Sequence, residues 1–269
     1  MNADSYDVQP LRIGAVSYLN SKPLIYGLDR LAPGVELILD VPSRLADALA
    51  DGSLDVALIP SIEYLRNPSY QFVSDACIAC RGPVLSVKLL SRKPVDEIRT
   101  LALDAGSRTS IALVRLLLRR CCNLNPATMP LPIGMAASDS KADAVLVIGD
   151  RAIQPAGDVF AEVWDLGEHW CEWARLPFVF ALWAARPGLD SEPIASILSA
   201  ARDQGVAHLE QIACAEADSV GLDPAACHAY LHDNLHFYFG ARERHGLDLF
   251  CRETLASEPI AGTMEQTRG

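Results

Sequence analysis

The chain repeats one pattern, in which a short apolar run ends in a polar turn and a helical pattern follows. The run at 13–16 passes through Ser17 and Asn20 to Pro23, and proline suits the first turn of a helix because its missing N–H costs nothing there. The run LDVALIP at 54–60 is apolar apart from Asp55, which is typical of a strand buried on both faces. Such strands alternating with helices predict an α/β fold with doubly wound, mostly parallel sheets flanked by helices.

Hydroxyl groups follow three successive strand ends, at Ser17, Ser43 and Ser61. Ligands of open α/β sheets bind just outside the carboxyl ends of the strands, so the turn with Ser17, Tyr18 and Asn20 falls where a small anion or polar molecule would be held. The alternative is that these side chains cap helices and bind nothing, and we expect Ser43 to be the N-cap of a helix that ends at Gly52.

A strongly amphipathic helix is predicted from residue 107 to 120. Its first turn contains Ser107, Arg108, Thr109 and Ser110. Free backbone N–H groups, three hydroxyls and a guanidinium in one turn indicate an anion site. Helix capping alone is the other interpretation of the same turn.

Two lobes are expected, because 269 residues suffice for about two domains. The strand-like run at 83–91 is long enough to leave one lobe and enter another, and a βα unit restarts after it. The apolar run that begins at Pro177 could return the chain to the first lobe. We therefore expect a first lobe of residues 10–91 and 184–269 and a second lobe of residues 92–183.

Composition excludes several classes of partner. The formal net charge is −11 and no basic run occurs, which argues against nucleic acid and against an anionic membrane surface. No apolar run approaches the roughly 20 residues that span a bilayer. The polar N-terminus lacks the features of a secretory signal, so we expect a cytoplasmic protein whose eight cysteines are reduced thiols.

Three histidines are spaced by four residues, at His228, His232 and His236, within a helix expected from 223 to 240. This spacing could form a transition-metal site, or the histidines could flank the apolar stripe beside them. No fourth ligand is evident, so we favour a surface feature and expect no metal.

Other groups of chemically reactive residues give only weak indications of a functional site. Cys77 and Cys80 lie in an apolar strand-like run with no second pair of ligands, which indicates buried thiols. Glu168, His169 and Glu172 could do acid–base work or form a solvated helix face. No nucleophile elbow, phosphate loop or dinucleotide fingerprint is present, so no nucleotide cofactor is expected.

Taken together, segments along nearly the whole chain resemble the chorismate dehydratases of the futalosine route to menaquinone. The resemblance is carried by VSYLNSKPL at 16–24, PSRLADALADGSLDVALIP at 42–60, GPVLSVKLLS at 82–91, LALDAGSRTSIALVRLLL at 101–118, LVIGD at 146–150, and VWDLGEHW with LPFVFALW at 163–183. The dihydroxynaphthoate synthases, a sister family, differ at the first turn and match less well. Ala174 and Arg175 replace the Thr-Gly that usually precedes Leu-Pro-Phe, so no role is carried over to them.

The resemblance implies a two-lobed fold similar to type II periplasmic binding proteins, with a ligand cleft between the lobes. It implies a hydro-lyase that removes water from chorismate to give 3-[(1-carboxyvinyl)oxy]benzoate, with no cofactor. A homodimer is left open. The rival function is a binding module for a small anion with no chemistry, since fold does not settle function.

The implied site has two sets of residues. Asn20 and Ser86 are the expected catalytic residues, with Asn20 orienting the substrate or its leaving hydroxyl. The expected substrate-binding residues are Ser17, Tyr18, Ser43, Ser61, Ser107, Arg108, Thr109, Ser110 and Asp150. The matched motifs contain no obvious base, which favours a carboxylate of the substrate in that role.

Overall fold

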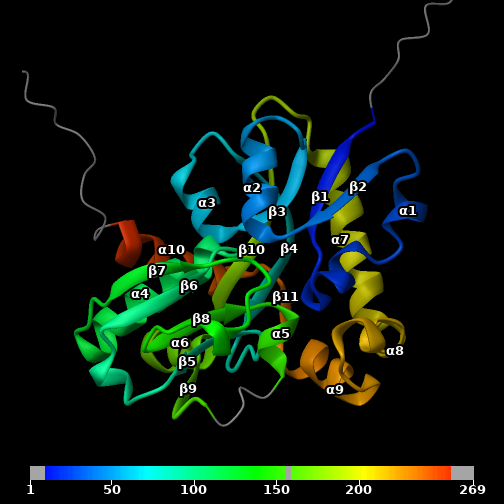
Figure 1. Ribbon diagram of the computed structural model, residues 1–269. Helices are drawn as coiled ribbons and strands as arrows, with labels where there is room; N and C mark the ends of the chain where they lie inside the picture. The colour runs from blue at the N-terminus through cyan, green and yellow to red at the C-terminus, as the bar shows by residue number, and fades with distance from the viewer. Residues whose placement is uncertain (1–9, 155–158, 256–269) are drawn as a thin grey trace, which may run out of the picture.

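The structure, a computed structural model, describes residues 10–154 and 159–255. It contains two β-sheets with helices packed around them (Figure 1). The first sheet is six-stranded, in the order β11-β4-β10-β3-β1-β2. Its strands are β1 (Arg12–Val16), β2 (Glu36–Asp40), β3 (Val56–Pro60), β4 (Gln71–Cys80), β10 (Phe178–Ala185) and β11 (His236–Tyr238).

The second sheet is five-stranded, in the order β7-β6-β8-β5-β9. Its strands are β5 (Val87–Ser91), β6 (Thr100–Asp104), β7 (Ala127–Leu131), β8 (Ala144–Ile148) and β9 (Glu162–Asp165). Each sheet with its helices is called a lobe below. The first lobe is the sheet of β1, and the second lobe is the sheet of β6.

Both sheets combine parallel and antiparallel pairs. In the first, β1 pairs in parallel with β2 and β3, while β10 and β11 add antiparallel pairs. In the second, β6 pairs in parallel with β7 and β8, while β5 is antiparallel to β8 and β9. The α/β class is confirmed, and parallel pairing is confined to the strands built from βα units.

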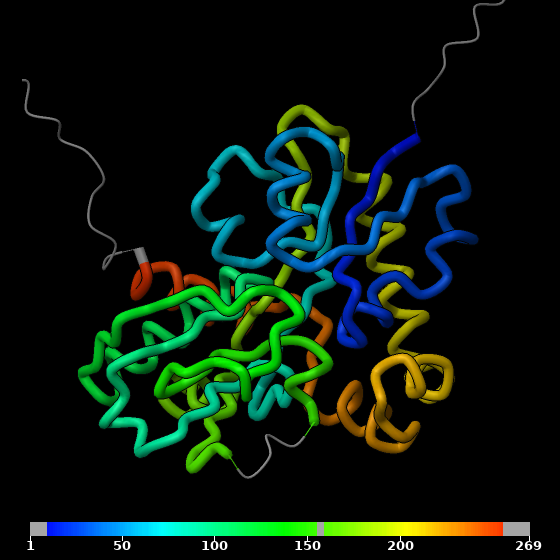
Figure 2. The backbone as a smooth tube through the Cα atoms, in the orientation of Figure 1, coloured from blue at the N-terminus to red at the C-terminus, as the bar shows by residue number. Residues whose placement is uncertain are grey.

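Helices cover both sheets. The first lobe carries η1 (Leu19–Ile25), α1 (Leu28–Leu31), α2 (Pro42–Ala50), α3 (Ser61–Arg66), α7 (Glu192–Ala207), α8 (Leu209–Val220), α9 (Pro224–Ala229), η4 (Tyr230–Asn234) and α10 (Ala241–Leu255). The second carries η2 (Val95–Glu97), α4 (Arg108–Cys122), η3 (Ala137–Asp139), α5 (Asp150–Ile153) and α6 (Leu166–Ala174). The red tube of α10 lies beside both α3 and the green second lobe, which it contacts through α4 (Figure 2).

The chain passes between the sheets at two places, which differ from the expected boundaries by one strand each. Strand β5 was expected in the first lobe and lies in the second sheet, whereas most of β10 was expected in the second lobe and lies in the first sheet. The passages are therefore the loop 81–86 and the segment 166–177, which includes α6. Residues 256–269 of the expected first lobe lie outside the described residues.

The most apolar strands are central. Every residue of β3, β8 and β10 is buried, as expected for strands covered on both faces. One continuous core joins the two lobes and includes the fully buried Trp170 and Trp183. None of the helices in the described part of the chain is both long and apolar enough to cross a membrane.

The helix predicted from 223 to 240 is wrong. Helix α9 ends at Ala229, the five residues of η4 form a π-helical turn, and β11 follows as an edge strand paired with β4. Burial of Phe237 and pairing with the free edge of β4 outweigh the helical spacing of the apolar residues.

Candidate functional site

A cavity lies where the carboxyl ends of β1, β6 and β8 face each other across the lobes. Its volume is about 40 Å³, room for a few water molecules. The polar residues that line it are Tyr18, Asn20, Ser86, Ser107 and Ser110. Apolar residues from both lobes close it, among them Val16, Ile78, Val84, Ile148 and Phe180.

The α4 wall of the cavity consists of Ser107 and Ser110 at the start of a 15-residue helix. Ser107 is the N-cap, and its Oγ accepts from the Ser110 backbone N–H at 3.4 Å and lies 3.0 Å from the Ser110 Oγ. Both residues are buried. Orphan N–H groups and the positive end of the helix dipole make this wall suitable for a carboxylate.

Asn20 lies on η1, which follows β1 directly. The turn is held by the Ser21 hydroxyl, which donates to the Val16 and Tyr18 carbonyl oxygens. Helix α7 packs against η1 at Gly205, where any Cβ would collide with the Pro23 carbonyl. A glycine here therefore brings α7 close enough to support the turn that carries Asn20.

Tyr18 crosses from the first lobe to the second. Its ring lies against Gly149, where a Cβ would come within 2.9 Å of ring atoms and where φ is +75°. Burial, with the nearby Asp104 carboxylate, raises the pKa of Tyr18 to about 12. The phenol is therefore a neutral hydrogen-bond donor at physiological pH.

Ser86 is presented by a strained turn in the passage 81–86. Leu85 has φ +58°, and the Ser86 N–H donates to the Val84 carbonyl at 2.7 Å. A left-handed conformation is costly for leucine, so something must hold it. The buried Asp165 carboxylate does so by accepting from the backbone N–H groups of Val84 at 2.9 Å and Leu85 at 2.6 Å.

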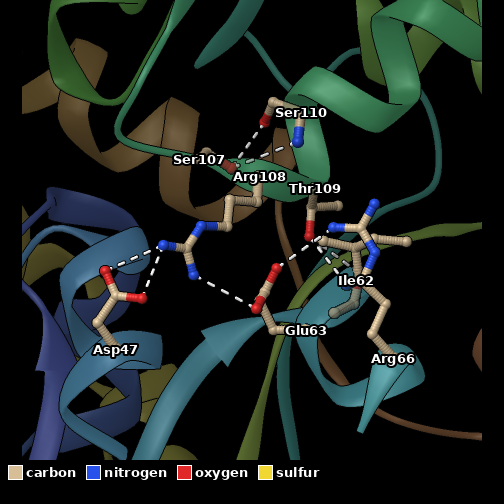
Figure 3. Close-up of polar contacts among 9 residues, drawn as sticks. Asp47, Ile62, Glu63, Arg66, Ser107, Arg108, Thr109 and Ser110 are labelled. Atoms are coloured by element: carbon tan, nitrogen blue, oxygen red, sulfur yellow. Dashed lines mark hydrogen bonds and ion pairs between the residues drawn. The ribbon is translucent and has the colours of Figure 1, made fainter. Parts of the chain in front are cut away.

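Three of the expected binding residues lie in contacts between the lobes and do not line the cavity. The Thr109 Oγ1 accepts from the Ile62 N–H at 3.2 Å and lies 3.4 Å from the Oγ of Ser61, whose hydroxyl also donates to the Val179 carbonyl of its own lobe at 2.7 Å. Arg108 reaches away from the α4 wall to Asp47 of α2, at 2.7 and 2.9 Å, and to Glu63 of α3 at 3.3 Å (Figure 3).

Ser17 and Ser43 also lie outside the cavity. Ser17 is exposed, and the hydroxyl of Ser43 makes no cap, because Val41 is the N-cap of α2 and Pro42 occupies its first turn. The N-cap predicted at Ser43 is thus wrong. Its backbone N–H instead donates to the Gly106 carbonyl of the second lobe at 3.0 Å.

Asp150 joins the lobes at the edge of the cavity. Its Oδ1 accepts from the Leu19 backbone N–H at 3.0 Å. Burial raises the pKa of the Asp150 carboxyl to about 6, against the lowering effect of that hydrogen bond and of Lys22. Asp150 therefore holds η1 against the second lobe and does not line the cavity.

The sequence interpretation missed Tyr230. It is 1% exposed, and its hydroxyl interacts with the side chains of Ser86 and Asn20. Tyr230 lies inside the helix predicted from 223 to 240, and that prediction gave the residue no role in the site. The one available signal was chemical, since a buried tyrosine hydroxyl usually has a polar partner.

The other constellations lie elsewhere. The His228 and His232 rings stack at 5.5 Å, but His236 is on β11 and not on their helix. Cys77 and Cys80 are buried free thiols. Among residues 10–154 and 159–255, no group of three or more suitable side chains could hold a metal ion. Of Glu168, His169 and Glu172, none lines the cavity.

Within the described chain, none of the residues that line the cavity is charged. The site offers hydroxyl, amide and helix-terminal N–H donors between apolar surfaces. Such a site can bind carboxylates and stabilise developing negative charge, but it has no carboxylate or imidazole to accept a proton.

Two mixed sheets, with a site at their facing strand ends and two passages between them, define a periplasmic-binding-protein-like fold. Solved structures agree. A structural-genomics target from Archaeoglobus fulgidus superposes with a TM-score of 0.75 at 16% identity, covering 93% of this chain and 98% of that one. The periplasmic aliphatic sulphonate binding protein of Escherichia coli gives 0.57 at 18% identity, covering 92% and 88%.

The family is defined by sequence. The model of a family described as menaquinone biosynthesis matches residues 11–255, and the chain belongs to that family. A chorismate dehydratase of Thermus thermophilus is 31% identical over 261 residues, which cover 90% of this chain and 94% of the relative.

Proposed function

We propose that the protein is a chorismate dehydratase of the futalosine pathway to menaquinone, a hydro-lyase that converts chorismate to 3-[(1-carboxyvinyl)oxy]benzoate and water. The cavity carries the proposal, because donors line both walls and no charged side chain among the described residues does. Membership of the menaquinone biosynthesis family and the similarity to the Thermus thermophilus enzyme support it. The cytoplasmic location expected from the sequence stays a prediction.

The reaction requires a site that binds two carboxylates and stabilises the negative charge that develops when the proton is removed. The reaction removes the proton from the ring carbon that bears the enolpyruvyl ether and expels the neighbouring hydroxyl, and the product ring is aromatic. The ring carboxylate is conjugated with the carbanion that develops. Donors of the α4 wall would bind that carboxylate and stabilise the charge, while Asn20 and Ser86 orient the ether and the leaving hydroxyl.

The base is best supplied by the substrate. Asp150 accepts from the Leu19 N–H, and Asp104 accepts from the Gly106 N–H at 2.9 Å and pairs with Arg151. These two carboxylates are thus engaged, as is that of Asp165 with the Val84 and Leu85 N–H groups, and none of the three lines the cavity. A carboxylate of bound chorismate, held beside the proton it removes, gains the advantage of an intramolecular reaction.

Chorismate is larger than the few water molecules for which the cavity has room, so the lobes must separate for it to enter. The contacts that open are the Ser43–Gly106 and Leu19–Asp150 hydrogen bonds and those of Thr109 and Arg108 with the first lobe. Partial closure of the lobes around the bound substrate would then shield it from water.

The test is to incubate the purified protein with chorismate, without metal or nucleotide, and to follow the ultraviolet spectrum and the product mass. We expect loss of one water and the appearance of a benzoate chromophore. Ser138→Ala, an exposed serine of the second lobe remote from the cavity, serves as the control variant. Unchanged chorismate with folded protein would contradict the proposal and favour the sister activity or a binding role, which a thermal-shift screen of small carboxylates would separate.

A further inference from the structure

Tyr230 places a buried hydroxyl next to the two proposed catalytic residues without lining the cavity itself. The Asn20 Oδ1, the Ser86 Oγ and the Tyr230 Oη are all buried, and none has a hydrogen-bond partner of normal geometry within the described residues. Buried polar atoms are nearly always paired, so three neighbouring exceptions at one site indicate a network that is completed when a ligand is bound.

The donors and acceptors of this group restrict how it can be completed. Asn20 Oδ1 can only accept, whereas Tyr230 and Ser86 each carry one hydroxyl proton. Ser86 lines the cavity, so its proton can serve a ligand. Tyr230 does not, so its proton can go to the Asn20 oxygen or to the Ser86 oxygen, and of these two only donation to Asn20 fixes the orientation of that amide.

The backbone holds Tyr230 at this position. It is the first residue of the π-helical turn η4, and π-helical turns are frequent at functional sites. The last residue of the turn, Asn234, donates from its Nδ2 to the Pro83 carbonyl at 3.0 Å. The turn is thereby fastened to the same passage that presents Ser86.

We propose that Tyr230 is a positioning residue that donates its hydroxyl proton to the Asn20 Oδ1. This donation directs the Asn20 amide nitrogen into the cavity as a donor and leaves the Ser86 proton for the substrate. The inference rests on the proposed function for its catalytic consequence. Burial also raises the pKa of Tyr230, which keeps the phenol protonated as the donation requires.

The first test is Tyr230→Phe, which removes the oxygen and keeps the ring. We expect kcat to fall about 10- to 30-fold while KM changes less than about threefold, because the lost interaction orients a group that acts in the transition state. The matched control is Tyr64→Phe, a tyrosine of α3 that does not line the cavity, with kcat expected to be unchanged. A Tyr230→Phe variant with wild-type kcat would overturn the proposal.

A double-mutant cycle separates positioning from a general structural effect. If Tyr230 acts through Asn20, adding Tyr230→Phe to Asn20→Ala changes kcat less than about threefold, whereas independent effects multiply. A double variant whose kcat falls by the product of the two single reductions would contradict the proposal that Tyr230 acts through Asn20.

A third measurement needs no substrate. The side-chain amide resonances of Asn20, assigned by their loss in Asn20→Ala, should shift in Tyr230→Phe and stay in place in Tyr64→Phe. Unmoved resonances would refute the contact. A wild-type protein that leaves chorismate unchanged would count against the proposed function alone, and these spectra would still decide the role of Tyr230.

Discussion

The two polar walls of the cavity are built differently. The α4 wall, Ser107 and Ser110, comes from four consecutive residues whose polar groups already bond to each other. The composite wall, Asn20 and Ser86 backed by Tyr230, comes from three distant segments, and its oxygens have no partners of normal geometry in the described part of the chain. A wall whose polar groups are hydrogen-bonded without ligand is suited to holding a substrate. A wall whose polar groups lack partners is suited to contact the substrate groups that change during the reaction.

The largest effect is expected at the composite wall. Asn20→Ala should lower kcat by about 10²- to 10³-fold and change KM by only a few-fold, as is typical when a donor to developing charge is removed. Steady-state kinetics and a binding isotherm for the product measure this. Weaker binding together with normal turnover of bound substrate would refute the catalytic role and make the two walls equivalent.

A smaller effect is expected where the composite wall is held. Asp165→Asn replaces one of the two carboxylate oxygens that accept from the Val84 and Leu85 N–H groups, so the strained turn should relax and displace Ser86. We expect kcat to fall about tenfold and the free energy of unfolding to fall by about 1–3 kcal/mol.

Asp143→Asn is the matched control for this variant. Its carboxylate likewise accepts two backbone N–H groups, from Arg99 and Thr100, but it lies away from the cavity. Urea unfolding should show a loss of stability in both variants, and the fall in kcat should be confined to Asp165→Asn. Equal turnover in the two would show that the turn needs no carboxylate to present Ser86.

The hydrogen bond between Asp150 and the Leu19 N–H, which lies beside the two walls, should make the free energy of unfolding depend on pH. The pKa of Asp150 is raised from its ordinary value near 3.8 to about 6, so the folded protein holds this proton more strongly than the unfolded chain does. The contribution of Asp150 to stability is therefore present below pH 3.8 and is lost as the pH rises through about 6.

Asp150→Asn cannot ionise and isolates this contribution. Its free energy of unfolding, relative to that of the wild type, should rise by about 2 kcal/mol between about pH 4.5 and about pH 7.5. Urea titrations at a series of pH values give the difference. A difference that does not vary with pH would mean that the carboxyl is solvated and that the lobes are open in solution.

The smallest effect is expected at the α4 wall. Ser107→Ala removes the N-cap of α4 and should lower the free energy of unfolding by about 0.5–2 kcal/mol. KM should rise a few-fold with kcat nearly unchanged, since the helix-terminal N–H groups remain. A fall in kcat as large as that of Asn20→Ala would break the distinction between the walls.

Local patterns were sufficient for much of the fold. The buried strand β3 and helix α4 were predicted, because each depends on a signal within a few residues. The passages were placed one strand late, because an apolar strand carries no information about the sheet that it joins.

The sequence by itself therefore determined the α/β class and the helix that begins at the polar turn 107–110, and family resemblance gave Asn20 and Ser86 as candidates. Only the tertiary structure decided which of these groups share a cavity. It placed Arg108, Ser61 and Thr109 in contacts between the lobes and brought Tyr230 next to Asn20 across 210 residues. The physical reason is that caps and periodicity are local energies, whereas the pairing of β11 with β4 and the contact of two lobes depend on surfaces distant in sequence.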